Sequence, residues 1–383
     1  MDDDTIYQGE TADGFAGGSG TAEDPYLIST PSQLKLMDMK INDGSGESQH
    51  YKLTADIDFN HMRWNPAGSS DSKFAGSFDG GSYTISNLKI LPEGDYAGMF
   101  GYISGADIKN LTLEGTMTVD GIKYVGGIVG HMEDSTLTSL TNRMTIDAKN
   151  ADSVGGIAGY TSITSGNTNV IKNCVNNADI TTHYEISGSS ITYVYSGGLV
   201  GRFSANSNYG TASILNSSNT GNISVDGEGN AWLYLYAGGL VGSTGNSTNA
   251  VNLVNSSNYG NVKEEISSAR LVYMTGIAHV YLQKGSVQNC MSAGTLSSTR
   301  PANLYEGLYV SSISSSTVSD CYVKSEDGTK SFYIPNASGG MGSSPSVTKG
   351  LGYFDENGNL KAVDGYTLDY ERTDKVRAIM NSE

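Results

Sequence analysis

Gly126-Gly127-Ile128-Val129-Gly130 decides the fold, because the chain repeats this stretch at intervals. Two glycines, two aliphatic residues and a third glycine recur at 155–159, 197–201 and 238–242, and weaker copies lie around residues 98, 276 and 307. The second glycine of this glycine phrase returns after 29 to 42 residues. A period in this range is typical of stacked repeats, in which each repeat packs mainly on its neighbours.

A second phrase follows most of the glycine phrases and ends in asparagine, as in Ile171-Lys172-Asn173, and a third short strand comes after it, as in Gly221-Asn222-Ile223. Three short strands separated by glycine or asparagine turns fit one coil of a parallel β-helix, whose coils lie about 4.8 Å apart. Glycine and asparagine accept the left-handed backbone at the corners. We expect the asparagines of the second phrase to stack as a ladder of side-chain amides: Asn110, Asn173, Asn216, Asn255 and Asn289.

The sequence therefore predicts an all-β fold, a right-handed parallel β-helix (solenoid) with short capping helices at its ends. Thr30-Pro31-Ser32-Gln33 combines an N-cap, a proline at the first helical position and a capping-box glutamine, so a short helix should run to about Ile41. A second short helix is expected at 374–380. The predicted organisation is a flexible tail at 1–16, N-terminal strands and cap of the β-helix at 17–95, the repeats at 96–325, and C-terminal strands with a capping helix at 326–383.

Composition excludes several kinds of partner. The formal net charge is −17, which argues against nucleic acid and against docking on an anionic membrane. No apolar run is long enough to span a membrane. The three cysteines, Cys174, Cys290 and Cys321, are too few for a disulfide framework and occupy matching repeat positions, so we expect buried small side chains; a Cys290–Cys321 disulfide is the geometrically conceivable alternative.

Catalytic and metal-binding patterns are weak. The five histidines include no His-Glu-x-x-His zinc motif, and we expect no metal and no cofactor. His131-Met132-Glu133-Asp134 places an imidazole beside two carboxylates, but acid–base chemistry needs such groups to converge in a cleft, and no partner cluster recurs nearby. The sequence therefore predicts a protein that is not an enzyme.

Aromatic residues recur just before the glycine phrases and are the candidate ligand-binding residues. In a stacked fold, matching positions form stripes, and a stripe of tyrosine and tryptophan suits sugar rings or protein contacts. The alternative is that these rings only cover the coil. The candidates are Tyr193, Tyr195, Trp232, Tyr234, Tyr236 and Tyr273.

The ordered series of phrases resembles the GLUG-repeat proteins, named for glycine, leucine, a variable residue and glycine. The lead-in is similar too, in Gly18-Ser19-Gly20-Thr21-Ala22-Glu23-Asp24-Pro25-Tyr26-Leu27-Ile28 and in Phe74-Ala75-Gly76-Ser77-Phe78-Asp79-Gly80. This resemblance covers roughly residues 17–325 and implies a β-helix with a surface role, plausibly adhesion, as in exported bacterial proteins and beside the peptidase of some IgA1-specific metallopeptidases. It implies no shared catalytic residues, and His279 departs from the pattern by replacing a closing glycine.

Together these observations predict a non-catalytic, exported cell-surface protein, an adhesin or binding module that displays loops and aromatics to a glycan or a host surface protein. Met1 followed by three aspartates resembles a start joined to a mature exported chain, so a lipid tether on a removed N-terminal segment would place the protein on the outer membrane; release outside the cell is the alternative. We expect a monomer. Two other functions stay open, a structural stalk that presents another domain and a carbohydrate-active β-helix enzyme.

Overall fold

The computed structural model describes residues 10–324, apart from 61, 93, 165, 186–189, 205–209, 231, 246–249 and 300–303, and further on residues 332–333, 351–355 and 359–363. These residues form an almost entirely β structure, and α1 (Pro31–Asn42) is the one helix among them. The second expected helix, at 374–380, lies outside the described residues. None of the helical residues described forms a segment long and apolar enough to cross a membrane.

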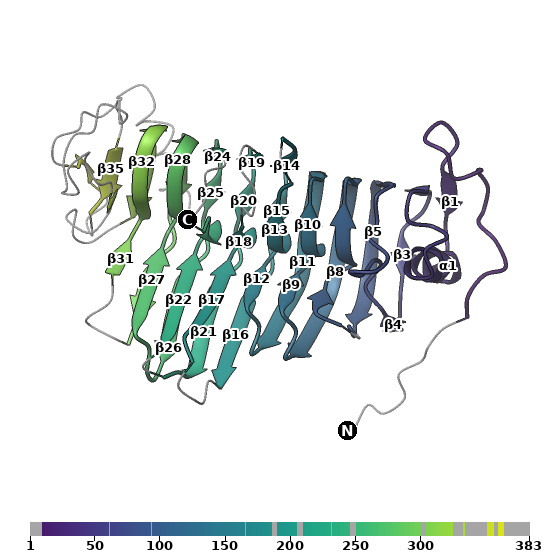
Figure 1. The fold of residues 1–383 in the computed structure, drawn as a ribbon, viewed down its shortest axis with the longest axis horizontal. Helices are drawn as coiled ribbons and strands as arrows, with labels where there is room; N and C mark the ends of the chain where they lie inside the picture. Colours follow the sequence, from purple (N-terminus) through teal and green to yellow (C-terminus); the bar gives the residue numbers. More distant parts are fainter. Residues whose placement is uncertain are drawn as a thin grey trace.

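The N-terminal end is built by α1 and short strands, which Figure 1 shows side by side at one end of the stack. The Thr30 side chain accepts a hydrogen bond from the Gln33 backbone N–H, and a proline occupies the first turn, as the sequence predicts. Within the expected tail, Phe15 stacks on Tyr26 with ring centroids 4.4 Å apart, so this part of the segment contacts the strands. The short strands are β1 (Tyr26–Ile28), β2 (His50–Leu53), β3 (Ile57–Asp58) and β4 (Arg63–Trp64).

The glycine phrases from residue 98 to residue 242 join two sheets, because each of them lies between a strand of one and a strand of the other; the last two phrases lead into the 24-stranded sheet instead. The seven-stranded sheet contains β6 (Tyr96–Ala97), β9 (Tyr124–Gly126), β12 (Ser153–Gly155), β17 (Thr192–Gly197), β22 (Leu233–Gly238), β27 (Leu271–Thr275) and β31 (Leu304–Glu306). The five-stranded sheet contains β7 (Phe100–Ser104), β10 (Val129–Glu133), β13 (Ala158–Ser162), β18 (Val200–Phe203) and β23 (Val241–Ser243).

The remaining strands, with β1 to β4, belong to one 24-stranded sheet. Three of them are long: β5 (Ser77–Ile90), β8 (Asp107–Asp120) and β11 (Thr136–Lys149). The shorter ones are β14 (Thr168–Lys172), β15 (Val175–Asn176), β16 (Ile180–Glu185), β19 (Thr211–Leu215), β20 (Ser218–Asn219), β21 (Ile223–Glu228), β24 (Ala250–Val254), β25 (Ser257–Asn258), β26 (Val262–Ile266), β28 (His279–Gln288), β29 (Met291–Ser292), β30 (Leu296–Ser298), β32 (Leu308–Ser319), β33 (Cys321–Lys324), β34 (Phe332–Tyr333), β35 (Leu351–Phe354) and β36 (Leu360–Ala362).

Strands pair with their counterparts one repeat away, and the paired strands are parallel except for β35 with β36. Val129 pairs with Ala158, Ala158 with Val200, and Val200 with Val241, so matching positions of the glycine phrase line up. These parallel sheets are consistent with a β-helix. The structure departs from the expected three short strands per coil in one respect. β8 and β11 are each one long strand that continues through a residue with left-handed backbone, Asn110 and Ser139.

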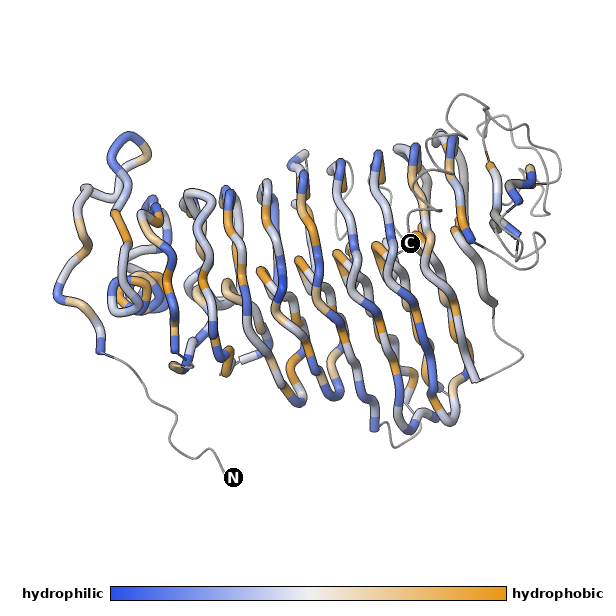
Figure 2. The backbone as a smooth tube through the Cα atoms, turned by 180° about the vertical axis from the view of Figure 1, so that it is seen from behind, coloured by the Kyte–Doolittle hydropathy of each residue, from blue (hydrophilic) through white to orange (hydrophobic). Residues whose placement is uncertain are grey.

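The core is a column of aliphatic side chains. The aliphatic pairs of the glycine phrases are fully buried, including Val200 and Val241. Cys174, Cys290 and Cys321 are buried free thiols, which fits their expected role as small core side chains. Figure 2 shows hydrophobic residues along the strands and hydrophilic residues at many of the bends.

The predicted asparagine ladder exists at the corner after the second phrase. Asn216 donates to Asn173 over 3.3 Å, Asn255 to Asn216 over 3.1 Å and Asn289 to Asn255 over 2.8 Å, and each of these residues has a positive φ. Asn110 belongs to the same corner and donates to Asp79 of the preceding repeat, and Ser139 of the following repeat interrupts the ladder between Asn110 and Asn173.

A second, buried ladder was not predicted. Asn142 donates to Asn176, Asn176 to Asn219 and Asn219 to Asn258, each over 2.8 Å, and all four side chains are fully buried. Each amide also donates to a backbone carbonyl two residues later, so it is satisfied within the core. This inner ladder lies directly against the second glycine of the glycine phrases: a Cβ on Gly198 would be 2.4 Å from Asn219 Cγ.

Candidate functional site

The candidate aromatic residues lie on the outer face of the seven-stranded sheet. On β17, Tyr193 and Tyr195 alternate with the buried Val194, and on β22, Tyr234 and Tyr236 alternate with the buried Leu235. Strand pairing places Tyr193 beside Tyr234 and Tyr195 beside Tyr236. The rings therefore form two rows, an inner row close to the glycine phrases and an outer row two residues earlier.

The inner row is largely covered by its own members. The ring centroids of Tyr195 and Tyr236 are 5.1 Å apart and those of Tyr236 and Tyr273 are 5.0 Å apart, with the ring planes nearly parallel. His279 packs against both Tyr236 and Tyr273. Only 7% of Tyr195 is exposed, so stacked faces in this row leave little room for a ligand.

The five-stranded sheet adds rings that the sequence reading missed. Tyr102, His131 and Tyr160 occupy matching positions on β7, β10 and β13, and they pack against Tyr96 and Tyr124. A signal for them was available, because each directly follows the closing glycine of its phrase. In the next repeat this position holds Arg202, whose guanidinium carbon lies 4.6 Å from the centroid of the Tyr195 ring.

The outer row differs because it includes exposed side chains, with Tyr234 half-buried among them. Among the described residues, four large hydrophobic side chains are exposed, and three of them lie here: Ile191 at 54%, Tyr193 at 46% and Trp232 at 40%. The rings of Tyr193 and Tyr234 stack 4.9 Å apart, and the Thr192 N–H donates to the Trp232 carbonyl over 3.1 Å, so the two repeats hold these side chains together.

One cation joins the outer row. Arg270 Nε donates to Tyr234 Oη over 2.9 Å, and the guanidinium carbon lies 5.9 Å from the centroid of the Trp232 ring. This contact is within the range of a cation–π interaction. We name Ile191, Tyr193, Trp232, Tyr234 and Arg270 the exposed aromatic cluster. Of the six sequence candidates it contains Tyr193, Trp232 and the half-buried Tyr234, whereas the buried Tyr195 and the half-buried Tyr236 and Tyr273 belong to the inner row.

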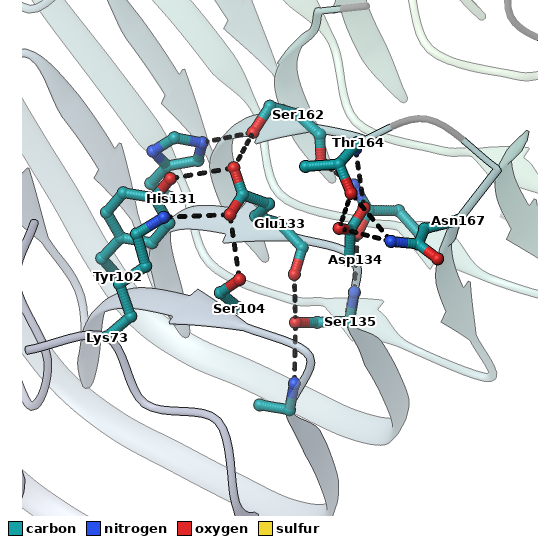
Figure 3. Close-up of polar contacts among 12 residues, drawn as sticks. Lys73, Tyr102, Ser104, His131, Glu133, Asp134, Ser135, Ser162, Thr164 and Asn167 are labelled. Atoms are coloured by element: carbon teal, nitrogen blue, oxygen red, sulfur yellow. Dashed lines mark hydrogen bonds and ion pairs between the residues drawn. The ribbon is translucent and has the colours of Figure 1, made fainter. Parts of the chain in front are cut away.

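The His131-Met132-Glu133-Asp134 stretch forms a polar network on the five-stranded sheet (Figure 3). Lys73 Nζ donates to Glu133 Oε1 over 3.0 Å, Ser104 Oγ donates to the same oxygen over 2.9 Å, and Tyr102 Oη donates to Oε2 over 3.1 Å. Burial alone would raise the pKa of Glu133, but the hydrogen bonds from Lys73 and Ser104 outweigh it and hold the pKa below its usual value. A carboxylate so well satisfied is a poor general base.

His131 does not complete a catalytic triad. Its Nε2 lies 2.8 Å from Ser162 Oγ, and Ser162 Oγ donates to Glu133 Oε2 over 3.3 Å. The serine therefore lies between the imidazole and the carboxylate, whereas nucleophile activation needs the imidazole in the middle. Burial lowers the pKa of His131 to about 4, and its Nδ1 is buried without a hydrogen-bond partner.

Two other polar groups, around Asp134 and His183, make structural contacts. Asp134 accepts hydrogen bonds from the Thr164 N–H and from Asn167 Nδ2, over 2.8 and 2.9 Å, so it fixes a corner (Figure 3). His183 bridges neighbouring repeats by contacting Asp226 and, over 3.3 Å, Asp147. Across the part of the chain that the structure describes, no group of three or more His, Cys, Asp or Glu side chains is arranged to hold a metal ion.

Comparison with known proteins gives partial matches. No family model matches the chain. A stretch of 127 residues, 30% of the chain, is 35% identical to a protein of Evansella cellulosilytica provisionally named a Gly-rich membrane protein and 36% identical to halomucin of Haloquadratum walsbyi. These matches cover only 14% and 1% of the respective relatives, so the chain corresponds to a small part of each.

Two solved structures share the fold over most of the chain. A protein of Bacteroides ovatus, provisionally named an immunoglobulin A1 protease, is similar over 96% of this chain and 91% of its own, with a TM-score of 0.57 and 22% identity. A structure named IgA1 protease is similar over 89% of this chain but only 25% of its own, with a TM-score of 0.52 and 15% identity. At these identities the similarity concerns the fold alone.

Proposed function

We propose that this chain is a non-catalytic binding module of an exported surface protein, built as a right-handed parallel β-helix of GLUG-type repeats. The parallel, in-register ladders support the β-helix. The membrane and mucin names among the sequence relatives, and the IgA1 protease names among the structural neighbours, support an exposed location on the cell surface or outside it. As an adhesin, the module would bind a glycan or a host surface protein.

The observation that carries this proposal is the exposed aromatic cluster. A fold gains stability by covering large apolar rings, yet Tyr193 and Trp232 remain about half as accessible as free side chains while Tyr195 of the inner row is buried. Flat rings with polar rims are suited to sugar rings and to protein hot spots. The catalytic alternative is weaker for two reasons. Glu133 already accepts several hydrogen bonds, and Ser162 lies between His131 and Glu133, where a catalytic triad would have the histidine.

Binding to a glycan array and to immobilised mucin tests the proposal. Trp232→Ala and Tyr193→Ala should each weaken binding about tenfold or more, because truncating a central aromatic contact commonly costs more than about 1 kcal/mol. Met39→Ala is the matched control, since Met39 is the fourth exposed large hydrophobic side chain among the described residues, 48% accessible, and lies on α1 at the N-terminal end. Binding that is unchanged in both aromatic variants, or reduced equally by Met39→Ala, would contradict the proposal.

A structural stalk is the second candidate. In three matched proteins the matched region is only 14%, 1% and 25% of the full length, so most of each protein lies outside it. This favours a region that presents another domain. A stalk would tolerate loss of the exposed rings without any loss of attachment, so the same variants distinguish the two functions.

A further inference from the structure

We propose that the exposed aromatic cluster binds a sugar that carries a carboxylate, a sialic acid or a uronic acid, and that Arg270 holds this carboxylate. The inference rests on the proposed function and names the class of ligand. Two observations support it: Arg270 lies against the rings, and its terminal nitrogens have no hydrogen-bond partner among the described residues. The stacking of the rings on one another would not need an arginine at this place.

Arg270 has hydrogen-bonding capacity left over beside the cluster. Its Nε is occupied by Tyr234 Oη, so the side chain is fixed in direction while the two terminal nitrogens remain for a ligand. A guanidinium binds a carboxylate with two parallel hydrogen bonds in this end-on geometry. Within the described part of the chain, no carboxylate lies at ion-pair distance from Arg270.

Arg270 differs in this respect from several exposed cations of the molecule. Acidic residues outnumber basic ones by 40 to 23, and Arg143 and Lys263 each pair with a carboxylate, Glu114 over 2.7 Å and Glu265 over 2.8 Å. An arginine kept apart from the abundant carboxylates, and placed against exposed rings, is available for an external anion.

A second guanidinium lies on the inner side of the cluster. Arg202 packs on Tyr195, which follows Tyr193 by two residues on the same face of β17, and its buried Nε has no hydrogen-bond partner. The nearby carboxyl group is that of Asp152. Burial raises the pKa of Asp152, and the charges of Lys123 and Arg202 oppose this rise. A second cation therefore lies near the rings, with its charge partly offset by Asp152, and Arg270 remains the cation available to an acidic ligand.

The rings select a sugar over a simple anion. The accessible part of Trp232 offers a flat face for the apolar side of a pyranose, and Tyr193 and Tyr234 place phenolic rims beside it for hydroxyl groups. A carboxylate on that sugar would reach the Arg270 terminal nitrogens, because Arg270 contacts both Trp232 and Tyr234.

Calorimetric titration of the full chain with defined probes tests the inference. Sialyllactose, lactose, a glucuronic acid oligosaccharide and a poly-glutamate peptide should be compared. We expect one or both acidic sugars to bind at least tenfold more tightly than lactose, and Arg270→Gln to remove about tenfold of that affinity while Arg143→Gln, an exposed arginine on another sheet, does not. The two acidic probes distinguish a sialic from a uronic acid ligand.

Each other outcome counts against a stated part of the account. Lactose binding that depends on Trp232 but not on Arg270 would overturn the carboxylate inference and leave the binding module intact. Tighter binding of poly-glutamate than of either acidic sugar would overturn the sugar class. Failure of every probe and of mucin to bind would overturn both the inference and the proposed function.

Discussion

At the scale of single residues, the glycine phrase is explained by what surrounds it. In the four complete phrases, the second glycine faces the inner asparagine ladder and the backbone of the next repeat. A Cβ on Gly198 would lie 2.2 Å from the Gly239 carbonyl oxygen and 2.4 Å from Asn219 Cγ. Neither group is the free end of a flexible side chain, so even alanine does not fit without moving the backbone.

Gly198→Ala should therefore destabilise the fold by about 2–3 kcal/mol, the upper part of the range for overpacked cores. Gly94→Ala is the control, because Gly94 is exposed and a Cβ there meets nothing within 4 Å. Urea unfolding followed by circular dichroism measures both. Equal midpoints for the two variants would remove the steric explanation of the repeat.

Buried histidines make stability depend on pH. Burial lowers the pKa of His131 and of His279 to about 4, from an ordinary value of 6.5. Near His131, the Glu133 carboxylate opposes this shift, and Lys73 and Lys123 add to it. Between pH 6.5 and 4 the unfolded chain binds protons that the folded chain does not, so the free energy of unfolding should fall as the pH falls through this window.

Denaturant unfolding between pH 7 and 4.5 measures this slope. We expect His131→Gln combined with His279→Gln to flatten it, because the protons taken up by the unfolded state are then fewer. Glu133 acts at lower pH, since its folded pKa lies below the ordinary 4.5 and its stabilisation is lost only beneath that value. An unchanged slope in the double variant would show that other groups dominate.

At the scale of elements, two asparagine ladders with different burial run along the stack. The outer ladder occupies left-handed corners, and the inner ladder is fully buried and bonded on every side. Asn219→Ala removes an acceptor from Asn176 and a donor to Asn258 inside the core, which should cost about 1–3 kcal/mol.

Asn216→Gly is the matched test on the outer ladder. Glycine keeps the positive φ of 49° and removes only a solvent-accessible amide, so we expect a change within about 1 kcal/mol. Thermal unfolding of the two variants measures the difference. A larger loss of stability for Asn216→Gly than for Asn219→Ala would show that the outer ladder, and not the inner one, contributes more to stability.

Sequence reasoning predicted α1, the parallel strands, the buried aliphatic pairs and the outer ladder, because each depends on local residue type and on the period. It missed the inner ladder, although Asn176, Asn219 and Asn258 each follow an outer-ladder asparagine by three residues. It also could not separate the exposed ring of Tyr193 from the covered ring of Tyr195. That distinction depends on packing across the bend between two sheets, where Arg202 of β18 lies on the Tyr195 ring and Tyr236 of the next repeat stacks on it.

At the scale of the whole molecule, each repeat is held mainly by its neighbours, and function is expected on the surface of the stack. Rings of neighbouring repeats stack in both rows, and Tyr193 and Trp232 of the outer row stay accessible. The proposed binding surface therefore exists only if consecutive repeats are in register, because Tyr193 and Trp232 come from different repeats.

The most direct test is a set of distances along one column of the 24-stranded sheet. Strand pairing joins Thr118 to Asp147, Thr181, Ser224, Lys263 and Ser297 in consecutive repeats. Spin labels at Thr118 and Lys263 should lie about 19 Å apart, and labels at Thr118 and Ser297 about 24 Å apart, because each repeat adds about 4.8 Å. Pulsed electron paramagnetic resonance measures these distances on a chain whose native cysteines are replaced. Distances that grow by about 4.8 Å per repeat would confirm the stack. Distances that do not increase by one strand spacing per repeat would contradict it.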